Sequence, residues 1–412
     1  MRRAMPFVAL VLLTISSARA ADDEAGFTPL FNGKDLSGWV PVNVAPNTFT
    51  VGDRMIDCTG VPTGVMRTDR QYENFVLELD YMHVKPGGNS GLFIWSDAIT
   101  SVGVPFTRAI EVQILDGQNT DNYTSHGDVF SIHGARMTPD RPHPGGWERC
   151  LPSERRAKPA GEWNHYRVEC NDGSIKLSVN GKEVSGGHNI HPRKGYVCLE
   201  SEGGTVHFRN IRIKELPSTG AKPADTAKLD EGFKSLYTGV DLSGWRVDGA
   251  ATTKWQPKDW TLVCDAKTES SDATLWTEKE YGDFVLIADW RLPEKKGDAA
   301  AGPTGTGTIR LRGPHGASLA IASPEGSGGI SASGGGAKSK AKADRAAGGW
   351  NRFMVTIKGN TCTVTLNGQT VTDNAQLPGA TAKGPIGVDF HGGAAEFANL
   401  YVRDLGPSGS AP

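Results

Sequence analysis

One motif in this chain occurs twice, and this repeat limits the possible folds more than any other feature. Residues 35–39 read Asp-Leu-Ser-Gly-Trp, and residues 241–245 read the same. Phe-Val-Leu at 75–77, Trp-Asn at 163–164 and an Asn-Gly pair at 180–181 also return, in the same order, in the second half. Repeat arrays have periods of only ~20–50 residues, so a separation of this size indicates a duplicated domain. A residue needed for folding should recur in both copies, whereas one needed for chemistry can survive in a single copy.

The length of 412 residues fits two domains of ordinary size, each able to bury its own core. The chain opens with Arg2 and Arg3, an apolar run over 7–15 and a small-residue cleavage site at 18–20. This pattern predicts a signal peptide that is removed after Ala20. The run is too short to span a bilayer, and no later stretch approaches ~20 apolar residues. We therefore expect a soluble protein with no membrane span, exported to the periplasm or the extracellular space, with cell-envelope association left open.

The charge balance argues against a nucleic-acid partner. The net charge is −2, with 44 basic and 46 acidic residues, whereas nucleic-acid binding calls for a strong basic excess. The six cysteines of an exported chain would allow 15 disulfide pairings. In the repeat, however, Cys170 aligns with Ile357 and Cys362 with Ile175, and a buried free cysteine behaves as a small hydrophobe. The sequence therefore leaves the presence of any disulfide open.

Short alternating runs with glycine turns indicate an all-β chain. Residues 175–179 alternate apolar and polar side chains, and Asn180-Gly181 then supplies a pair suited to a tight turn. With 52 glycines and little helical periodicity, each half is predicted to be a β-sandwich or jelly roll. We expect the first domain at 26–216, a linker rich in Pro, Ala, Lys and Asp at 217–231, and the second domain at 232–405.

The two copies differ most in one block. The separation of matching residues falls from 209 at Phe75 and Phe284 to 187 at Trp163 and Trp350, so the second copy is 22 residues shorter there. Its residues 323–349 are mostly Gly, Ser, Ala and Lys, which predicts a flexible loop. The first copy is instead crowded with His, Asp, Glu, Arg and aromatic residues in this block. The scaffold is duplicated, but this block is not.

The first candidate cluster lies on a predicted strand. Ile110, Val112 and Ile114 fall on one face of it, and Glu111 and Gln113 fall on the other. The apolar face belongs in the core, so the polar pair should project beside the loop that carries Asn89. The matching stretches of the second copy, 304–310 and 317–321, have neither the Asn nor the Glu/Gln pair. A solvated strand face is the simpler interpretation, but loss of the pair together with the block favours function.

A second cluster contains Glu200 and Glu202, which again share one strand face. The second copy has Asp389 and His391 at the matching positions. Paired carboxylates can divide the acid and base roles when their environments separate the two pKa values. Two exposed glutamates at a strand edge are the alternative interpretation.

The third cluster is the differing block itself, whose members suit proton transfer and sugar recognition. Histidine titrates near neutrality, while Arg and Trp can bridge hydroxyl groups and stack on sugar rings. No recognised spacing of metal ligands is present, so the sequence predicts no cofactor or metal, although it leaves a divalent cation such as calcium open. An ordinary loop surface would explain any single one of these residues. The members are His126, Asp128, His133, Arg136, Asp140, Arg141, His143 and Trp147.

Five segments together resemble the 3-keto-disaccharide hydrolase family: 29–39, 88–91, 111–116, 161–164 and 208–211. The match covers nearly all of the first copy in the right order, whereas the second copy matches only at the ends of its framework. The resemblance implies two tandem concanavalin-like jelly-roll β-sandwiches, the second degenerate. It also implies a hydrolase or lyase that acts on glycosides oxidised at C3 of a sugar ring, with a carbohydrate as substrate.

The resemblance further implies site residues. It carries Asn89, Glu111 and Gln113 onto this chain, followed by Glu200 and Glu202. The family often has Arg soon after the Asn-Ser-Gly turn, where this chain has Trp95. A C3 ketone acidifies the C2 hydrogen, so a carboxylate or histidine could remove it, after which the group at C1 leaves and water adds back.

We therefore expect Glu111, His133 and Glu200 to be catalytic. The residues expected to bind substrate are Asn89, Gln113, Trp95, Arg136, Trp147 and Glu202. The alternative function is a non-catalytic, lectin-like glycan-binding module at the cell surface, since β-sandwiches also serve in that role. A purely structural surface protein would explain the duplication but not the asymmetry between the copies.

Overall fold

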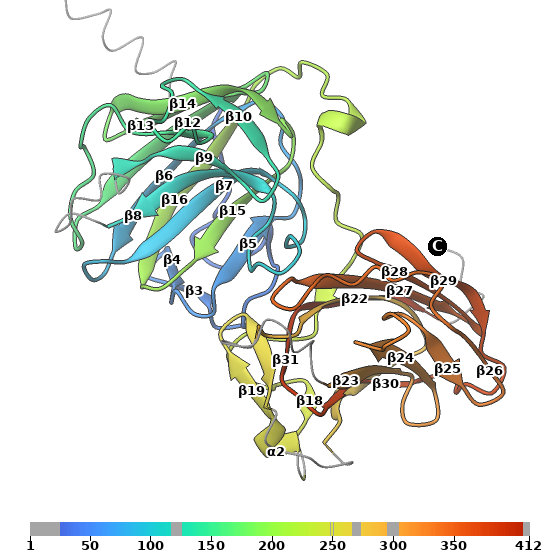
Figure 1. Ribbon diagram of the computed structural model, residues 1–412. Coiled ribbons are helices and arrows are strands. Elements are labelled where there is room, and N and C mark those ends of the chain that lie inside the picture. The colour runs from blue at the N-terminus through green and yellow to red at the C-terminus, as the bar shows by residue number, and fades with distance from the viewer. Residues whose placement is uncertain are drawn as a thin grey trace, which may run out of the picture.

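The computed structural model describes residues 25–116, 126–247, 249, 251–265, 273–294 and 305–406. These residues form two tandem β-sandwiches, the first drawn in blue to green and the second in yellow to red in Figure 1. The all-β prediction is therefore confirmed. The predicted signal peptide at 1–20 lies outside the described residues. No helix in the described part of the chain is long and apolar enough to cross a membrane.

Within the described residues, the first sandwich consists of a nine-stranded and a seven-stranded antiparallel sheet. In spatial order, the nine-stranded sheet comprises β10 (Arg136–Pro139), β14 (Lys182–His191), β13 (Ser174–Val179), β12 (Asn164–Asn171), β6 (Phe75–His83), β16 (Val206–Glu215), β4 (Met55–Cys58) and β3 (Phe49–Gly52), with β1 (Thr28–Pro29) also on β16. The seven-stranded sheet comprises β11 (Arg149–Cys150), β9 (Val129–Ile132), β8 (Ala109–Leu115), β7 (Asn89–Ser96), β15 (Tyr196–Ser201), β5 (Gly64–Thr68) and β2 (Trp39–Pro41).

The second sandwich repeats this plan with an eight-stranded and a seven-stranded sheet in the part that the structure describes. The larger sheet comprises β19 (Trp255–Lys258), β20 (Thr261–Cys264), β31 (Ala395–Gly406), β22 (Asp283–Arg291), β27 (Asn351–Lys358), β28 (Thr361–Leu366) and β29 (Gln369–Gln376), with β17 (Lys234–Ser235) also on β31. The smaller comprises β18 (Trp245–Arg246), β21 (Leu275–Tyr281), β30 (Gly384–His391), β23 (Thr306–Leu311), β24 (Ala317–Ile321), β25 (Ile330–Ala332) and β26 (Gly335–Ala337). A short helix, α2 (Ala251–Lys254), precedes β19.

Strand alternation builds a separate apolar core in each sandwich. Along β8, Ile110, Val112 and Ile114 are buried in the first core, as their spacing predicts. All six cysteines lie in the described part of the chain, and all are free and buried. They occupy apolar strand positions, as the repeat alignment indicated, and no disulfide forms among them.

The predicted flexible loop at 323–349 is the main departure from the expected fold. The structure orders this stretch and places β25 and β26 in it, paired through Ile330 with Ala337 and Ser331 with Gly336. The prediction of a flexible loop was wrong because it relied on the low-complexity composition, and glycine-rich strands can still pair through their backbones. The tight approach there requires small residues: a Cβ on Gly336 would lie 2.4 Å from the Ile330 carbonyl oxygen.

The segment 217–231, expected to be a linker, is packed against the first sandwich. It runs along the first one and contains the 3₁₀ turn η2 (Pro223–Asp225) (Figure 1). Asp97 accepts a hydrogen bond from the Lys228 amide, and Arg67 forms an ion pair with Asp230 at 2.7 Å. These contacts attach the segment to the first sandwich and limit its length as a spacer.

The two sandwiches pack against each other through a small apolar cluster. Phe93 and Cys198 on the outer face of the first seven-stranded sheet meet Ile287 and Tyr401 on the large sheet of the second sandwich. A loop of the first sandwich, residues 97–108, also inserts into the second: Asp289 accepts from the Gly103 amide at 2.8 Å. The second sandwich thus covers part of the sheet that carries the candidate site.

Candidate functional site

The predicted polar residues meet on the outer face of the first seven-stranded sheet, which we call the carboxylate face. Gln113 on β8 pairs with Gly91 on β7, and Glu111 pairs with Phe93. Leu199 on β15 pairs with Leu92, so the next residue, Glu200, lies opposite Gly91. Register alone therefore places Glu111, Gln113 and Glu200 around one glycine.

Gly91 is what allows the two carboxylates to converge. A Cβ at this position would lie 2.6 Å from Glu200 Oε2 and 3.1 Å from Glu111 Oε1. Real Cβ atoms do not approach other atoms to 2.6 Å, so any side chain here would displace the Glu200 carboxylate. Both acids are almost fully buried, with 7% of Glu111 and 1% of Glu200 exposed. The site thus holds two acids in a confined, poorly hydrated space.

An amide chain borders these acids. Gln113 Nε2 donates to Asn89 Oδ1 at 2.8 Å, and Asn89 Nδ2 in turn donates to the Glu202 carboxylate. Asn89 and Glu202 also form a β-bridge through their backbones. The structure therefore brings together five of the residues expected from the sequence: Asn89, Glu111, Gln113, Glu200 and Glu202.

Close packing of glycines holds this end of the site. A Cβ on Gly60 would lie 2.2 Å from the Gly204 nitrogen, and one on Gly204 would lie 2.8 Å from the Gly88 Cα. The Gly203 amide donates to the Gly60 carbonyl at 2.8 Å. The loops that carry Asn89 and Glu202 are consequently packed backbone to backbone, which fixes both side chains.

Two further charged residues, Asp128 and Arg149, lie beside these acids, although the sequence analysis did not place them in the site. Asp128 precedes β9 and is fully buried, and Arg149 on β11 donates to it through Nε. The Arg149 guanidinium also lies 4.0 Å from the centre of the Phe130 ring. Asp128 was visible in the third cluster, but only the pairing of β9 with β8 shows that it adjoins Glu111.

The electrostatics favour protonated carboxyls. Burial raises the pKa of Glu111 well above its usual value, and Asp128 and Glu202 add to this while Arg149 opposes it. Burial also raises the pKa of Glu200 strongly, followed by repulsion from Glu111 and Glu202. Burial brings the pKa of Asp128 to about 6 despite Arg149. Because charging these acids together is costly, protons remain bound here at pH values where an ordinary carboxyl is ionised.

Two buried oxygens of this group lack a hydrogen-bond partner. Glu200 Oε2 and Asp128 Oδ1 have none among the described residues. Buried polar atoms are nearly always satisfied, so orphaned ones mark a place where a proton, water or ligand is expected. The same part of the chain contains no group of three or more His, Cys, Asp or Glu that could hold a metal ion.

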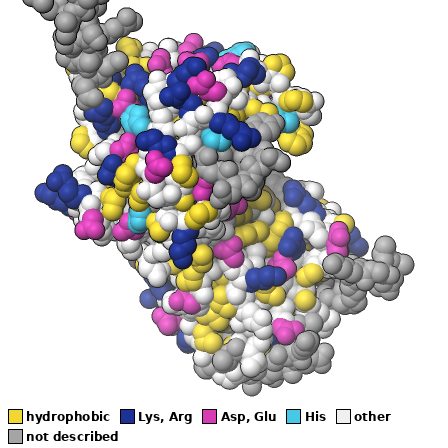
Figure 2. Space-filling view, turned by 90° about the vertical axis from the view of Figure 1, so that its left-hand side faces the viewer, with side chains coloured by type: hydrophobic (Ala, Val, Ile, Leu, Met, Phe, Trp, Pro, Cys, Tyr) yellow, Lys and Arg dark blue, Asp and Glu magenta, His cyan; other side chains and the backbone are white. Residues whose placement is uncertain are grey.

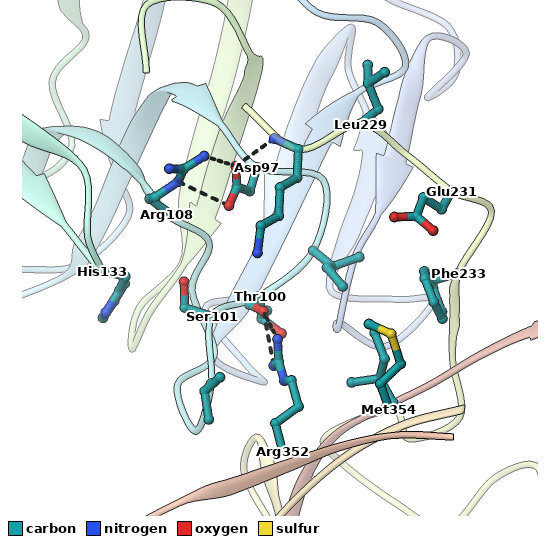
Figure 3. Close-up of a pocket in the computed structure, with 14 residues that line it drawn as sticks. Asp97, Thr100, Ser101, Arg108, His133, Leu229, Glu231, Phe233, Arg352 and Met354 are labelled. Atoms are coloured by element: carbon teal, nitrogen blue, oxygen red, sulfur yellow. Dashed lines mark hydrogen bonds and ion pairs between the residues drawn. The ribbon is translucent and has the colours of Figure 1, made fainter. Parts of the chain in front are cut away.

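His133, expected to be catalytic, lies away from this group. It follows the end of β9, beyond the Ala109–Ile132 pair, while Gln113, Asn89 and Glu202 lie at the opposite end of the sheet. Its ring stacks on Phe106, and burial lowers its pKa. It borders a cavity of about 670 Å³ between the sandwiches, across from Phe233 and Met354 (Figure 3). The structure therefore does not bring His133 to the carboxylates.

Arg136 and Trp147, both expected to bind substrate, also lie elsewhere. Arg136 is on β10 in the nine-stranded sheet, where its largely exposed side chain pairs with Glu148 at 3.0 Å. Trp147 is 62% exposed and stacks on His143 with 4.5 Å between the ring centres. The structure does not bring either of them to the carboxylates.

The expectation that Trp95 binds substrate is wrong, because this residue belongs to the core. Its side chain is fully buried, packs against Phe75 and donates to the Glu73 carbonyl at 2.8 Å. A bulge shifts the register between β7 and β15 here, and Trp95 has a left-handed φ of 54°. The bulge turns the indole inward, so no ring surface is left for a sugar to stack on.

The second sandwich has lost all but one of the acids of this face. Strand register places Ser318 at the position of Glu111, Ala320 at that of Gln113 and Thr306 at that of Asn89. The Ala320 amide bonds the Gly329 carbonyl as the Gln113 amide bonds that of Asp128, so glycine replaces this acid. These substitutions remove both the convergent carboxylates and the amide chain.

Asp389 remains at the position of Glu200, but a cation now neutralises it. Lys254 Nζ lies 3.5 Å from Asp389 Oδ1, and His391 Nε2 lies 2.8 Å from Oδ2. On the face shown in Figure 2, the histidine side chains lie on the upper part of the molecule, which is the first sandwich. Only the first sandwich thus keeps a group of buried, mutually repelling acids on its small sheet, within the described residues.

Comparisons with known proteins agree with this duplicated plan. A family model described as the 3-keto-alpha-glucoside-1,2-lyase-like domain matches residues 26–214 and again residues 232–403. The 3-keto-disaccharide hydrolase of Bacteroides thetaiotaomicron is 25% identical over 252 residues, which cover 47% of this chain and 80% of that protein. A structure of a candidate glycosyl hydrolase from Parabacteroides distasonis is 24% identical, with a TM-score of 0.36 and coverage of 50% of this chain and 99% of that one.

A β-glucanase from Bacillus licheniformis is 14% identical, with a TM-score of 0.31 and coverage of 47% of this chain and all of that one. The two matches to the family model together cover most of the sequence. The chain therefore belongs to the family of the 3-keto-alpha-glucoside-1,2-lyase-like domain, is a carbohydrate-active protein of the 3-keto-disaccharide hydrolase type, and carries this domain twice in tandem.

Proposed function

We propose that the first sandwich cleaves glycosides oxidised at C3, with the carboxylate face as its active site. The observation that carries this proposal is the burial of Glu111 and Glu200 together over Gly91, an arrangement that the second sandwich has lost. Buried acids that repel each other cost folding free energy, so their retention in one copy supports a chemical role.

The C3 ketone determines the reaction. It acidifies the hydrogen at C2, so a carboxylate can take this proton and leave an enolate. The electron pair then expels the leaving group from C1, and the oxygen of that group accepts a proton. Addition of water across the new double bond gives net hydrolysis, while its omission gives elimination.

The electrostatics suggest which acid has which role. Burial raises the pKa of Glu111, but Arg149 opposes this rise, so we assign Glu111 as the base. Burial and then the charges of Glu111 and Glu202 raise the pKa of Glu200, and we assign it as the acid that protonates the leaving group. Asn89 and Gln113 can orient the sugar through their amides.

A comparison of three variants tests this proposal. Glu111→Gln and Glu200→Gln should each lower kcat on a 3-keto-glycoside by about 10²–10⁴-fold, the usual contribution of general acid–base catalysis. Asp389→Asn is the matched control, because it removes the equivalent acid of the second sandwich and should leave turnover unchanged. Unchanged turnover in Glu111→Gln would remove this residue from the mechanism.

The unoxidised parent glycosides, assayed with and without chelator, complete the test. The mechanism requires the ketone, so these should not be cleaved. Glycan binding without product release would instead support the lectin-like alternative. We also propose that the protein is exported, because its first 20 residues read as a signal peptide; sequencing the N-terminus of the mature protein and fractionating the cells would test this and any attachment to the envelope.

A further inference from the structure

A turn of the second sandwich lies against the edge of the carboxylate face. Asp259 and Trp260 form the two-residue turn between β19 and β20, closed by the Lys258–Thr261 pair. In Figure 1 this hairpin reaches the lower end of the first sandwich. The Asp259 carboxylate accepts from the Thr63 amide and from the Thr63 hydroxyl, both at 2.7 Å. One side chain of the second sandwich thus holds a segment of the first at two points.

Further contacts make this junction rigid. The Tyr237 hydroxyl donates to the Asp259 carbonyl at 3.0 Å, which holds the turn from behind. Gly239 packs on Pro62 so closely that a Cβ on it would lie 2.5 Å from the Pro62 ring. The Ser201 hydroxyl donates to the Pro62 carbonyl at 2.8 Å, which links the segment to β15. The position of Thr63 is therefore determined from both sandwiches.

Thr63 lies beside Glu202 at the end of the β5–β15 ladder. Gly64 on β5 and Ser201 on β15 form the last pair of this ladder, and Thr63 and Glu202 are the residues next to that pair. Glu202 in turn accepts from Asn89, whose amide contacts Gln113. Asp259 thus holds the residue beside Glu202, and Glu202 is hydrogen-bonded to the amides of the proposed site.

Because Asp259 holds the strand neighbour of Glu202, we propose that the second sandwich completes the site of the first, with Asp259 as a positioning residue for Glu202 and, through Glu202, for Asn89. This inference rests on the proposed function. The second domain would then have a role of its own: it has lost the group of repelling acids but positions part of its neighbour's site.

The charges around Glu202 are consistent with this role. The charged groups that face it are Glu111, Glu200 and Asp259, while Asn89 donates to it. Burial raises the pKa of Glu202, the hydrogen bond from Asn89 lowers it, and the Asp259 charge raises it again. Removing that charge should therefore move the titration of Glu202 to lower pH.

The chain offers a matched control. Asp53 occupies the same turn of the first sandwich, between β3 and β4, with a φ of 47° against 52° for Asp259. It lies on the nine-stranded sheet, away from the carboxylate face. Substitution of Asp53 therefore tests the effect of changing such a turn without touching the proposed contact.

The experiment compares Asp259→Asn, Asp259→Ala and Asp53→Asn in the full chain. Carbon-13 spectra of glutamate-labelled protein report the carboxyl of Glu202, assigned by the signal that Glu202→Gln removes. We expect Asp259→Asn to shift this titration to lower pH and to move the matching limb of the pH–rate profile in the same direction. Asp259→Ala should also lower kcat/KM by up to about 10²-fold, the cost of a misplaced site group.

The outcomes separate this inference from the proposed function. A Glu202 titration that is unchanged in Asp259→Asn, or shifted equally in Asp53→Asn, overturns the positioning role. The spectra need no substrate, so an absence of turnover in the wild-type chain counts against the proposed function alone. Thermal melts identify any variant that fails to fold, and Thr63→Val then removes the hydroxyl hydrogen bond to Asp259 from the other side, which should also lower kcat/KM.

Discussion

At the scale of single residues, this protein keeps acids where folding alone would remove them. Glu200 is 1% exposed, one of its oxygens has no hydrogen-bond partner among the described residues, and its nearest charges are other carboxylates. A buried acid without a cation is unfavourable when charged. The second sandwich shows how this is relieved, because Lys254 lies beside Asp389 at the equivalent position.

The pH dependence of stability should therefore reveal Glu200. Its pKa in the folded chain is raised above the unfolded value of 4.5, so the folded chain binds a proton that the unfolded chain releases. The stability that this proton provides is complete below the unfolded pKa and is lost as pH rises toward the folded one. We expect Glu200→Gln, which cannot ionise, to become progressively more stable than the wild type above pH 4.5, as measured by urea denaturation.

A residue with the opposite sign provides the control. Hydrogen bonds from Arg70 lower the pKa of Glu215, which lies on the surface. Glu215→Gln should therefore be slightly less stable than the wild type at neutral pH and equal to it in acid. If Glu200→Gln followed this second pattern, the buried acid would be ionised in the folded protein and the role assigned to it would be wrong.

At the scale of elements, the two copies share the same local solutions. Asn180-Gly181 and Asn367-Gly368 both form turns in which each residue has a positive φ. In both turns the Asn side chain accepts from the backbone amide of the residue directly after Trp-Asn, which is His165 in the first copy and Arg352 in the second. These turns recur because the hairpin needs them.

Glycine is required at these turns for its backbone conformation alone. No atom lies within 4 Å of a Cβ placed on Gly181 or Gly368, while φ is 85° and 84°. Replacing either glycine by alanine should lower the free energy of unfolding by roughly 1–2 kcal/mol, the cost of a left-handed L-residue. Urea denaturation checks this, and an equal loss in the two variants is expected because the two turns match.

At the scale of the whole molecule, a buried acid joins the sandwiches in addition to the apolar cluster and the Asp259–Thr63 contact. Asp289 accepts from Arg352 at 2.6 and 2.8 Å, from Asn399 at 2.8 Å and from the Gly103 amide of the first sandwich at 2.8 Å. Asn399 and Arg352 also donate to carbonyls of the same inserted loop, including that of Thr100. Removing the acid would leave a buried cation and release the loop.

Asp289→Ala should consequently cost roughly 3–5 kcal/mol, as expected when one partner of a buried ion pair is removed. We also expect the sandwiches to unfold separately, which calorimetry would show as two transitions. The control is Asp80→Ala, the equivalent acid of the first sandwich, which bonds His165 and Asn210 within that domain. That variant should destabilise the first sandwich without separating the pair.

Much of this organisation follows from local sequence patterns. Alternation on β8 is enough to place Ile110 in the core and Glu111 on the outer face, because strand side chains alternate strictly. The same logic fails at Trp95, where a bulge adds a residue and reverses the facing of the side chain. The prediction for His133 also fails. Proximity to other polar residues in the sequence does not show that a residue lies at the same end of the sheet as they do.

The duplication, the strand-rich fold and the polar strand faces follow from the amino-acid sequence alone, because each depends on periodicities a few residues long or on direct repetition. The folded chain was needed to show that Glu111 and Glu200 meet over Gly91, that Asp128 joins them, and that Asp259 of the other domain contacts Thr63 beside Glu202. These facts depend on which strands pair, in which register, and on how two separately folded sandwiches pack. No local pattern carries that information, because the residues concerned lie up to half the chain apart.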